Sequence, residues 1–304
     1  MEKRRIGSLE VSVVGLGCNN FGWRIGKAET RDVVFAALES GINFLDTADI
    51  YGGGQSEEYV GEALQGRRDE VVLATKFGMS MGEGKSGGSA AWVRQACEDS
   101  LRRLKTDRID LYQLHTPDAK TPISETLEAL DRLVKAGKVR EIGCSNFSAA
   151  ELRQAEAAVK PGAARFVSVQ NQYSLFHREP EAEVLQECKK LGIAFIPFFP
   201  LANGLLTGKY RKGQPLPENS RGKDAFGPNM FSEKNLDIVE DLIRFASERG
   251  HSLLELAISW LAAQDGVASV IAGARTVEQV KTNAKAAGWA LSPADLRAID
   301  AILG

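Results

Sequence analysis

Short apolar runs alternate with longer amphipathic segments along almost the whole chain, and this alternation limits the possible folds more than any other feature. The apolar runs predict strands at residues 11–15, 43–46, 71–75, 109–114, 139–144, 166–169, 194–197 and 268–271. Most of them are continuous rather than alternating, which is typical of parallel strands covered on both faces. Eight such strands alternating with helices fit either a closed (β/α)8 barrel or an open doubly wound sheet.

The segments between the strands have the i, i+3/i+4 apolar spacing of helices. We expect helices at residues 30–40, 56–64, 90–104, 123–136, 149–159 and 181–191. Ser56, before two glutamates, and Ser148, three residues before Glu151, are helix-start signals. Outside this regular series we expect a hairpin at residues 3–14 that turns at residues 7–8 and a C-terminal helix at 294–303. Two helices, at 231–248 and 252–264, are expected before the last strand, one more than the regular series requires.

Length and composition narrow the class of protein. The 304 residues suffice for two average domains or one large barrel, and because no linker-like boundary divides them we expect one domain over residues 1–304. A net charge of −2 predicts no nucleic-acid or membrane-surface partner, and no apolar run approaches the roughly 20 residues of a membrane span. Four scattered cysteines without a CxxC pair predict reduced thiols and a cytoplasmic location. Because no heptad pattern occurs, we expect a monomer.

Polar side chains recur at the carboxyl ends of the expected strands. Asp46, Lys76, His115, Asn146 and Gln170 each close or follow an apolar run. Taken singly, each has an ordinary structural explanation as a helix cap, a solvated charge or a partner of loop backbone groups. Five of them at equivalent positions favour the barrel, because its strand ends converge on one mouth where active sites form. An open sheet would spread them along an edge.

Tyr51 lies five residues after Asp46, on the loop expected to border that mouth. A phenol has a pKa near 10 and is a weak acid at neutral pH. We expect the Lys76 ammonium to lower that pKa and the Asp46 carboxylate to hold the lysine charged. Together with His115, these groups are suited to proton transfer with a carbonyl oxygen. The sequence has neither the residue pairing of a serine-type nucleophile nor the spacing of a metal site.

Five segments in this order resemble the aldo-keto reductase superfamily: residues 44–52, 74–76, 111–115, 143–147 and 169–173. The resemblance runs from about residue 5 to residue 290, and residues 204–209, Gly-Leu-Leu-Thr-Gly-Lys, are similar to those of bacterial members. It implies a (β/α)8 TIM barrel that binds NADPH or NADP⁺ without a Rossmann domain and reduces aldehydes or ketones to alcohols. It also implies that Tyr51 donates the proton, that Lys76 and Asp46 tune it, and that His115 orients the carbonyl group.

The same resemblance implies a set of cofactor contacts. They are Gly17, Asn19, Asp46, Ser145, Asn146, Gln170, Phe198, Phe199, Leu201, Asn203, Gly204, Leu206, Gly273, Arg275, Gln279 and Asn283. Phe199 departs from the family, which often has Ser there, so backbone groups of residues 201–204 are expected to hold the phosphates instead. Arg275 suits a 2′-phosphate, which favours NADPH over NADH. A solvated Arg275 is the alternative.

The expected substrate pocket is aromatic. It comprises Phe21, Trp23, Tyr51, Phe77 and His115, together with Met79, Trp92 and the loop at residues 209–229. Trp92 has a second interpretation, as a core residue of its own helix. Residues 15–20 begin like a G-x-G-x-x-G dinucleotide motif but end in Asn20, so they are a weak match.

Two other functions remain open from the sequence. One is a regulatory or sensor subunit that binds NADP(H) with little turnover. The other is an aldolase in which Lys76 forms a Schiff base.

Overall fold

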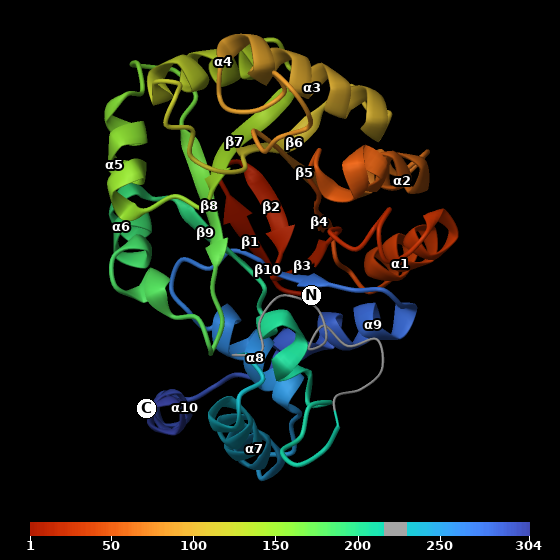
Figure 1. Ribbon diagram of the computed structural model, residues 1–304, viewed down its shortest axis with the longest axis vertical. Coiled ribbons are helices and arrows are strands. Elements are labelled where there is room, and N and C mark those ends of the chain that lie inside the picture. The colour runs from red at the N-terminus through yellow and green to blue at the C-terminus, as the bar shows by residue number, and fades with distance from the viewer. Residues whose placement is uncertain (216–229) are drawn as a thin grey trace.

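The described residues, 1–215 and 230–304 of a computed structural model, place eight parallel strands in one barrel. The strands are β3 (Val14–Gly17), β4 (Phe44–Asp46), β5 (Val72–Phe77), β6 (Ile109–Leu114), β7 (Val139–Ser145), β8 (Phe166–Gln172), β9 (Ala194–Phe198) and β10 (Val270–Gly273). β10 pairs with β3, and Phe195 of β9 bridges Val267 just before β10, so the sheet curls into a nearly closed ring (Figure 1). The predicted barrel is confirmed.

Helices surround the barrel on its outside (Figure 1). They are α1 (Lys27–Glu39), α2 (Gln55–Ala63), α3 (Ala90–Leu104), α4 (Ile123–Lys135), α5 (Ala149–Ala157), α6 (Val184–Leu191), α7 (Glu233–Ser247), α8 (Leu253–Ala262), α9 (Val277–Lys285) and α10 (Pro293–Leu303). Both α7 and α8 precede β10, one helix more than the regular strand–helix alternation requires; α8 contacts β10, whereas α7 packs against α8 and α10. In the described part of the chain, no helix has the length and apolar character needed to cross a membrane.

An antiparallel hairpin, β1 (Lys3–Ile6) and β2 (Leu9–Ser12), covers the N-terminal end of the barrel. Its turn lies at residues 7–8, as predicted. Its apolar face joins the side chains that fill the barrel interior in one buried cluster, which includes Ile6, Leu9, Val11, Phe44, Val72 and Leu111. The hairpin therefore closes one end of the barrel and leaves the carboxyl ends of the strands for a site.

The first and last barrel strands lie about two residues later than predicted. The expected strand at 11–15 combined the end of the hairpin with the start of β3, because residues up to Ser12 pair with β1. The last strand, expected at 268–271, runs from Val270 to Gly273 since Val270 pairs with Val14. The register of this closing pair, rather than local apolar character, sets both boundaries.

The start of α5 agrees with the prediction from the sequence, whereas the starts of α2 and α6 differ from it. Ser148 and Glu151 form the predicted capping box of α5. Ser56 caps nothing: it lies inside α2, and its hydroxyl donates to the carbonyl of Cys18 instead. The helix expected at 181–191 begins only at Val184, because a 3-10 turn containing Pro180 precedes it.

Candidate active site

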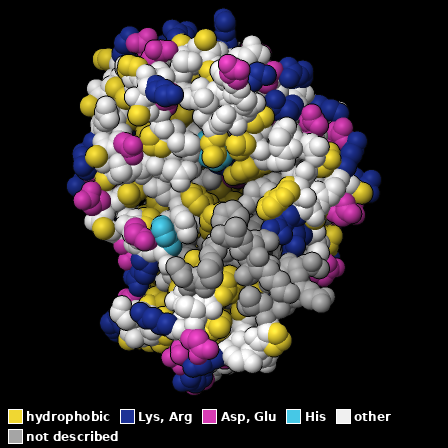
Figure 2. All heavy atoms as spheres, in the orientation of Figure 1, with side chains coloured by type: hydrophobic (Ala, Val, Ile, Leu, Met, Phe, Trp, Pro, Cys, Tyr) yellow, Lys and Arg dark blue, Asp and Glu magenta, His cyan; other side chains and the backbone are white. Residues whose placement is uncertain are grey.

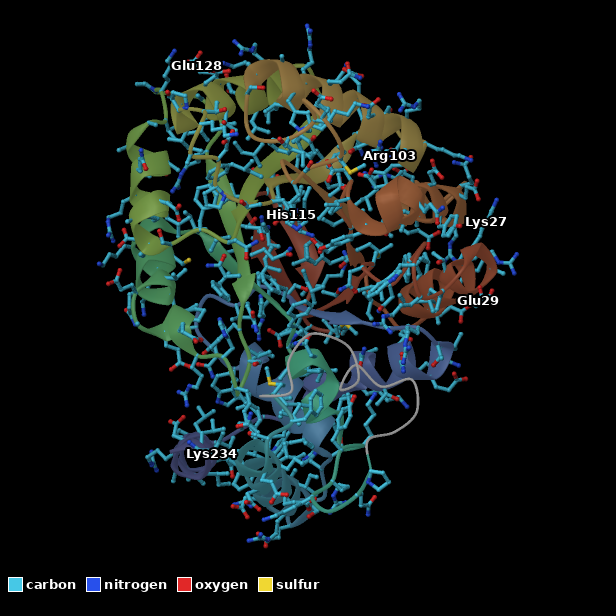
Figure 3. All side chains as sticks on the ribbon, in the orientation of Figure 1. Lys27, Glu29, Arg103, His115, Glu128 and Lys234 are labelled. Atoms are coloured by element: carbon cyan, nitrogen blue, oxygen red, sulfur yellow. The ribbon has the colours of Figure 1, made fainter. Side chains whose placement is uncertain are left out.

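A cleft of about 670 Å³ opens at the carboxyl ends of the strands. Figure 2 shows a hollow in this face of the molecule with hydrophobic side chains gathered around it, and Figure 3 places His115 at the mouth of the barrel. Residues from β3, β4, β7, β8, β9 and β10 line the cleft. Its volume is within the range of roughly 300–1,000 Å³ found for small-molecule sites.

Asp46 and Lys76 form a buried ion pair at the centre of this site. Asp46 ends β4, and Lys76 lies on the neighbouring strand β5. Lys76 Nζ donates to Asp46 Oδ2 at 2.6 Å and to the carbonyl oxygen of Thr47 at 2.9 Å. Burial alone lowers the pKa of Lys76, but Asp46 and Tyr51 outweigh it and raise that pKa above its ordinary value. Lys76 is therefore an ammonium ion at neutral pH.

Tyr51 stands above this pair, on the short 3-10 turn that follows β4. Lys76 Nζ donates to the Tyr51 hydroxyl at 3.4 Å. Burial raises the pKa of Tyr51 above its usual value near 10, although the Lys76 charge opposes the change. The Lys76 ammonium thus lowers this pKa, as expected from the sequence, but the loss of solvation outweighs it and the net change in the pKa is upward. The phenol keeps its proton at neutral pH, which is the state a proton donor requires.

Gly52 lets the Tyr51 turn fold against the loop after β3. Its φ is +59°, and a Cβ built there would lie 2.9 Å from the carbonyl oxygen of Phe21. A side chain at this position would be both strained and obstructed. The glycine therefore fixes where Tyr51 sits relative to the barrel mouth.

His115 borders Tyr51 from the end of β6. Its backbone N–H donates to the carbonyl of Phe77 at 2.8 Å, and its ring meets the Tyr51 ring edge-on with the centroids 5.9 Å apart. Burial, together with the charge of Lys76, lowers the pKa of His115 to about 3. The imidazole is therefore neutral and offers one N–H as a hydrogen-bond donor.

Two glutamine side chains complete the surroundings of the Asp46 carboxylate. Gln113 Nε2 and Gln170 Nε2 donate to Asp46 Oδ1 at 3.2 and 2.8 Å. Gln170 was predicted from the sequence as a site residue, whereas Gln113 was not. The available signal was a polar residue two positions before His115, at the carboxyl end of β6.

Ser145 and Asn146 lie side by side at the end of β7. Asn146 has a left-handed φ of +61°, and its Nδ2 donates to the carbonyl of His115 at 2.9 Å and to Ser145 Oγ at 3.2 Å. Neither Asn146 Oδ1 nor Gln170 Oε1 accepts a hydrogen bond from any residue in ranges 1–215 and 230–304. Two unused acceptors in one cleft match the N–H donors of a carboxamide.

The predicted cofactor residues come together, with one exception. Gly17, Asn19, Asp46, Ser145, Asn146, Gln170, Phe198, Phe199, Leu201, Asn203, Gly204, Gly273, Arg275, Gln279 and Asn283 all line the cleft. Leu206 does not: its side chain is buried in the hydrophobic core, and its N–H donates to the carbonyl of Leu201. The chain turns between Gly204 and Leu206 and carries that side chain away from the cleft.

Some of the predicted substrate residues line the cleft and others do not. Tyr51, His115 and Met79 line the cleft. Phe21 and Phe77 do not, since both are fully buried in the core. Trp23 also lies outside the cleft lining and is 62% exposed. The structure therefore does not bring these three side chains into the cleft.

Other parts of the expected pocket also differ. Trp92 lines a separate cavity of about 70 Å³. Within the loop expected at 209–229, Lys209 lines the main cleft, and residues 216–229 lie outside the described residues. Ile50, Thr207 and Leu254 line the cleft and were missed. Thr207 could have been predicted, because it belongs to the 204–209 segment that resembles the family. Nothing in the local sequence around Leu254 indicated that it lines a cleft.

Among the described residues there is no candidate for a reactive thiolate or for a metal site. All four cysteines are buried and free. Burial raises the pKa of Cys18 and of Cys144 well above the ordinary thiol value, so neither is a thiolate at neutral pH. No group of three or more His, Cys, Asp or Glu side chains is arranged to hold a metal ion in residues 1–215 and 230–304.

Comparison with known proteins gives consistent matches over nearly the whole chain. The family model described as "Aldo/keto reductase family" matches residues 13–304. A Bacillus subtilis (strain 168) protein described as "Uncharacterized oxidoreductase YqkF" is 38% identical over 293 residues, covering 94% of this chain and 91% of its own length. "Aldo-keto reductase YhdN" from the same organism is 36% identical over 309 residues, with 97% and 91% covered.

A solved structure matches as well. It is described as the glycerol dehydrogenase AKR11B4 from Gluconobacter oxydans and is 33% identical to this chain. The two superpose with a TM-score of 0.86, over 99% of this chain and 94% of the other.

Proposed function

The chain belongs to the aldo/keto reductase family of oxidoreductases, and from this premise we propose that it is an NADPH-dependent reductase of aldehydes and ketones with Tyr51 as its proton donor. One observation carries the proposal: a protonated phenol is held 3.4 Å from an ammonium that is itself fixed by a carboxylate at 2.6 Å, at the mouth of an open cleft. This is a proton-transfer site aimed at a developing alkoxide.

The residues of the cleft fit a nicotinamide dinucleotide. Asn146 Oδ1 and Gln170 Oε1 accept no hydrogen bond within the described part of the chain and could accept from the carboxamide, and Ser145 lies beside Asn146. Arg275 lines the same cleft, and its guanidinium makes no ion pair with any described residue, so it is available for a phosphate. When bound, the dinucleotide would supply a hydride at the nicotinamide C4.

The chain's own residues would carry the proton. His115, neutral because its pKa is about 3, donates an N–H to the substrate carbonyl oxygen and orients it. As negative charge grows on that oxygen, the Tyr51 hydroxyl gives up its proton. The phenolate left behind is stabilised by the Lys76 ammonium, and Asp46 keeps that ammonium charged. A phenol whose pKa is raised by burial needs this partner at the moment of transfer.

Substrate class and cofactor choice follow from the same site. Arg275, which has no ion-pair partner among the described residues, supports NADPH over NADH, because a guanidinium binds a 2′-phosphate through charge-assisted hydrogen bonds. The likeness to a protein described as a glycerol dehydrogenase supports small alcohol–carbonyl pairs as substrates.

Loss of NADPH absorbance with 4-nitrobenzaldehyde tests the proposal. Tyr51→Phe should lower the rate by about 10²–10⁴-fold, the usual contribution of a general acid. The matched control is Tyr59→Phe, a partly exposed tyrosine on α2 with a single long contact to Gln55, which should keep the wild-type rate. If wild type oxidises NADPH no faster than Tyr51→Phe across a panel of aldehydes and ketones, the proposed function is wrong. Borohydride reduction in the presence of substrate should leave Lys76 unmodified.

A further inference from the structure

The part of the cleft formed by β10 and α9 carries two opposite charges. Arg275 and Glu278 both line it. They are not paired with each other, and neither makes an ion pair or a side-chain hydrogen bond with any residue in ranges 1–215 and 230–304. The guanidinium is half-buried and the carboxylate is exposed. Two charges of opposite sign, without partners among the described residues, therefore line the same part of the cleft.

Hydrogen bonds in the first turn of α9 fix the backbone positions of Arg275 and Glu278. Thr276 Oγ1 accepts from the backbone N–H of Gln279 at 3.3 Å, and Gln279 Oε1 accepts from the backbone N–H of Arg275 at 2.8 Å. The Thr282 hydroxyl donates to the carbonyl of Glu278 at 2.8 Å. Glu278 is thus held in the first helical turn, where the helix dipole stabilises a negative charge.

A dinucleotide with a 2′-phosphate differs from one without it by roughly two negative charges, as for any phosphate monoester near neutral pH. Arg275 attracts these charges and Glu278 repels them. A carboxylate also accepts hydrogen bonds from the free ribose hydroxyls of the unphosphorylated dinucleotide. The two side chains therefore act in opposite directions on the choice between the two ligands.

We propose that Glu278 is a specificity-determining residue that partly offsets Arg275, and so reduces, without reversing, the preference of the chain for NADP(H) over NAD(H). The proposal rests on the dinucleotide site of the proposed function. It assigns to Glu278 a role that opposes, rather than supports, the preference expected from Arg275 alone.

Calorimetric titration of the whole protein with NADP⁺ and with NAD⁺ tests this without turnover. Glu278→Gln should tighten NADP⁺ binding by about three- to tenfold, the size expected for removing a nearby like charge in water. NAD⁺ binding should stay the same or weaken. Because both groups are solvent-accessible, the gain for NADP⁺ should shrink at high ionic strength.

Two variants control the experiment. Glu29 is another exposed first-turn carboxylate, on α1 and outside the cleft lining, so Glu29→Gln should leave both affinities unchanged (Figure 3). Arg275→Met should weaken NADP⁺ binding far more than NAD⁺ binding. The proposal is overturned if Glu278→Gln changes the ratio of the two affinities no more than Glu29→Gln does, or if it weakens NADP⁺ binding. Wild type that binds neither dinucleotide would instead overturn the proposed function, together with this inference.

Discussion

At the scale of single residues, the Asp46 carboxylate is surrounded by donors that make its burial tolerable. Lys76 binds one of its oxygens, and the amides of Gln113 and Gln170 bind the other. A buried charge pair is costly to form, but breaking it by removing one partner is costlier still. In the proposed mechanism the lysine therefore has a structural as well as a chemical function.

Replacing Lys76 with Met should separate these two functions. We expect a fall in kcat of about 10²–10⁴-fold, since no ammonium remains beside Tyr51, and a loss of about 3–5 kcal/mol in the free energy of unfolding. Steady-state kinetics and urea denaturation measure both. Lys135→Met, which breaks an exposed pair on α4, is the control and should change little. Wild-type turnover in the Lys76 variant would contradict the assignment.

Asp49 predicts a pH dependence of stability. It is buried with both carboxylate oxygens unpaired among the described residues, and burial together with the nearby Glu57 raises its pKa to about 7. The folded state thus holds this proton more tightly than the unfolded state, whose pKa is near 3.9. The free energy of unfolding therefore falls as pH rises through this interval, and the full cost is present above pH 7.

Asp49→Asn should remove that cost. The variant should therefore have a higher free energy of unfolding than wild type at pH 8. This gain over wild type should be at least about 1 kcal/mol larger at pH 8 than at pH 5. Urea denaturation at the two pH values measures the difference. Asp107→Asn, at a side chain 89% exposed, should show no such difference. Equal shifts at both pH values for Asp49→Asn would show that the buried carboxylate is not the cause.

The main site residues were predictable because each polar side chain interrupts an apolar run at a strand end. Phe77 shows where such reasoning fails. Successive side chains on a strand point to opposite faces, so with Lys76 in the site Phe77 must face the helices, where its ring stacks on Tyr112 at 4.7 Å. The raised pKa of Tyr51 was not predictable, because its burial depends on neighbours contributed by several strands.

At the scale of elements, the N-terminal hairpin closes the end of the barrel opposite the cleft. Ile6→Ala should lower the free energy of unfolding by about 2–5 kcal/mol, because it empties a packed buried cluster. kcat/KM should stay unchanged in the folded variant, since the hairpin lies at the end opposite the cleft. Arg5→Ala, at the exposed neighbouring position on β1, is the control. A marked change in kcat/KM for Ile6→Ala would show that the packing of the hairpin affects the cleft.

Most elements were predictable from periodicity and caps, and the errors have a common cause. Ser56 has the sequence of a helix start, yet its hydroxyl serves the Cys18 carbonyl and pairs with Thr47 at 2.8 Å. The boundaries of β3 and β10 likewise depend on partners far along the chain. Tertiary contacts decided each of these cases, and local sequence does not encode them.

At the scale of the whole molecule, the cleft joins strands from both ends of the chain. β3 and β10 pair through residues 14–17 and 270–273, and no local pattern encodes this long-range closure. The barrel was nevertheless predictable, because the regular strand–helix cadence and the polar strand ends leave few alternatives. The near-zero net charge is a property of the whole sequence and did not reveal that Arg275 and Glu278 have no ion-pair partner among the described residues.

NADP⁺ should therefore stabilise the entire fold. A ligand present at 100 times its Kd adds about 2.7 kcal/mol to the free energy of unfolding, so the Tm should rise with ligand concentration in a thermal scan. Tyr51→Phe should show the same rise, because Tyr51 acts on the carbonyl substrate and not on the dinucleotide. A Tm independent of NADP⁺ would contradict the assignment of the cleft.

The central claim is that the cleft reduces a carbonyl group by hydride transfer while Tyr51 supplies the proton. Its most direct test is a single turnover with NADPH deuterated on the transferred position of C4 and 4-nitrobenzaldehyde, with mass analysis of the alcohol. Wild type should yield alcohol carrying one deuterium on carbon, while Tyr51→Phe binds NADPH and forms product about 10²–10⁴-fold more slowly. Alcohol without deuterium, or equal single-turnover rates for the two proteins, would contradict the claim.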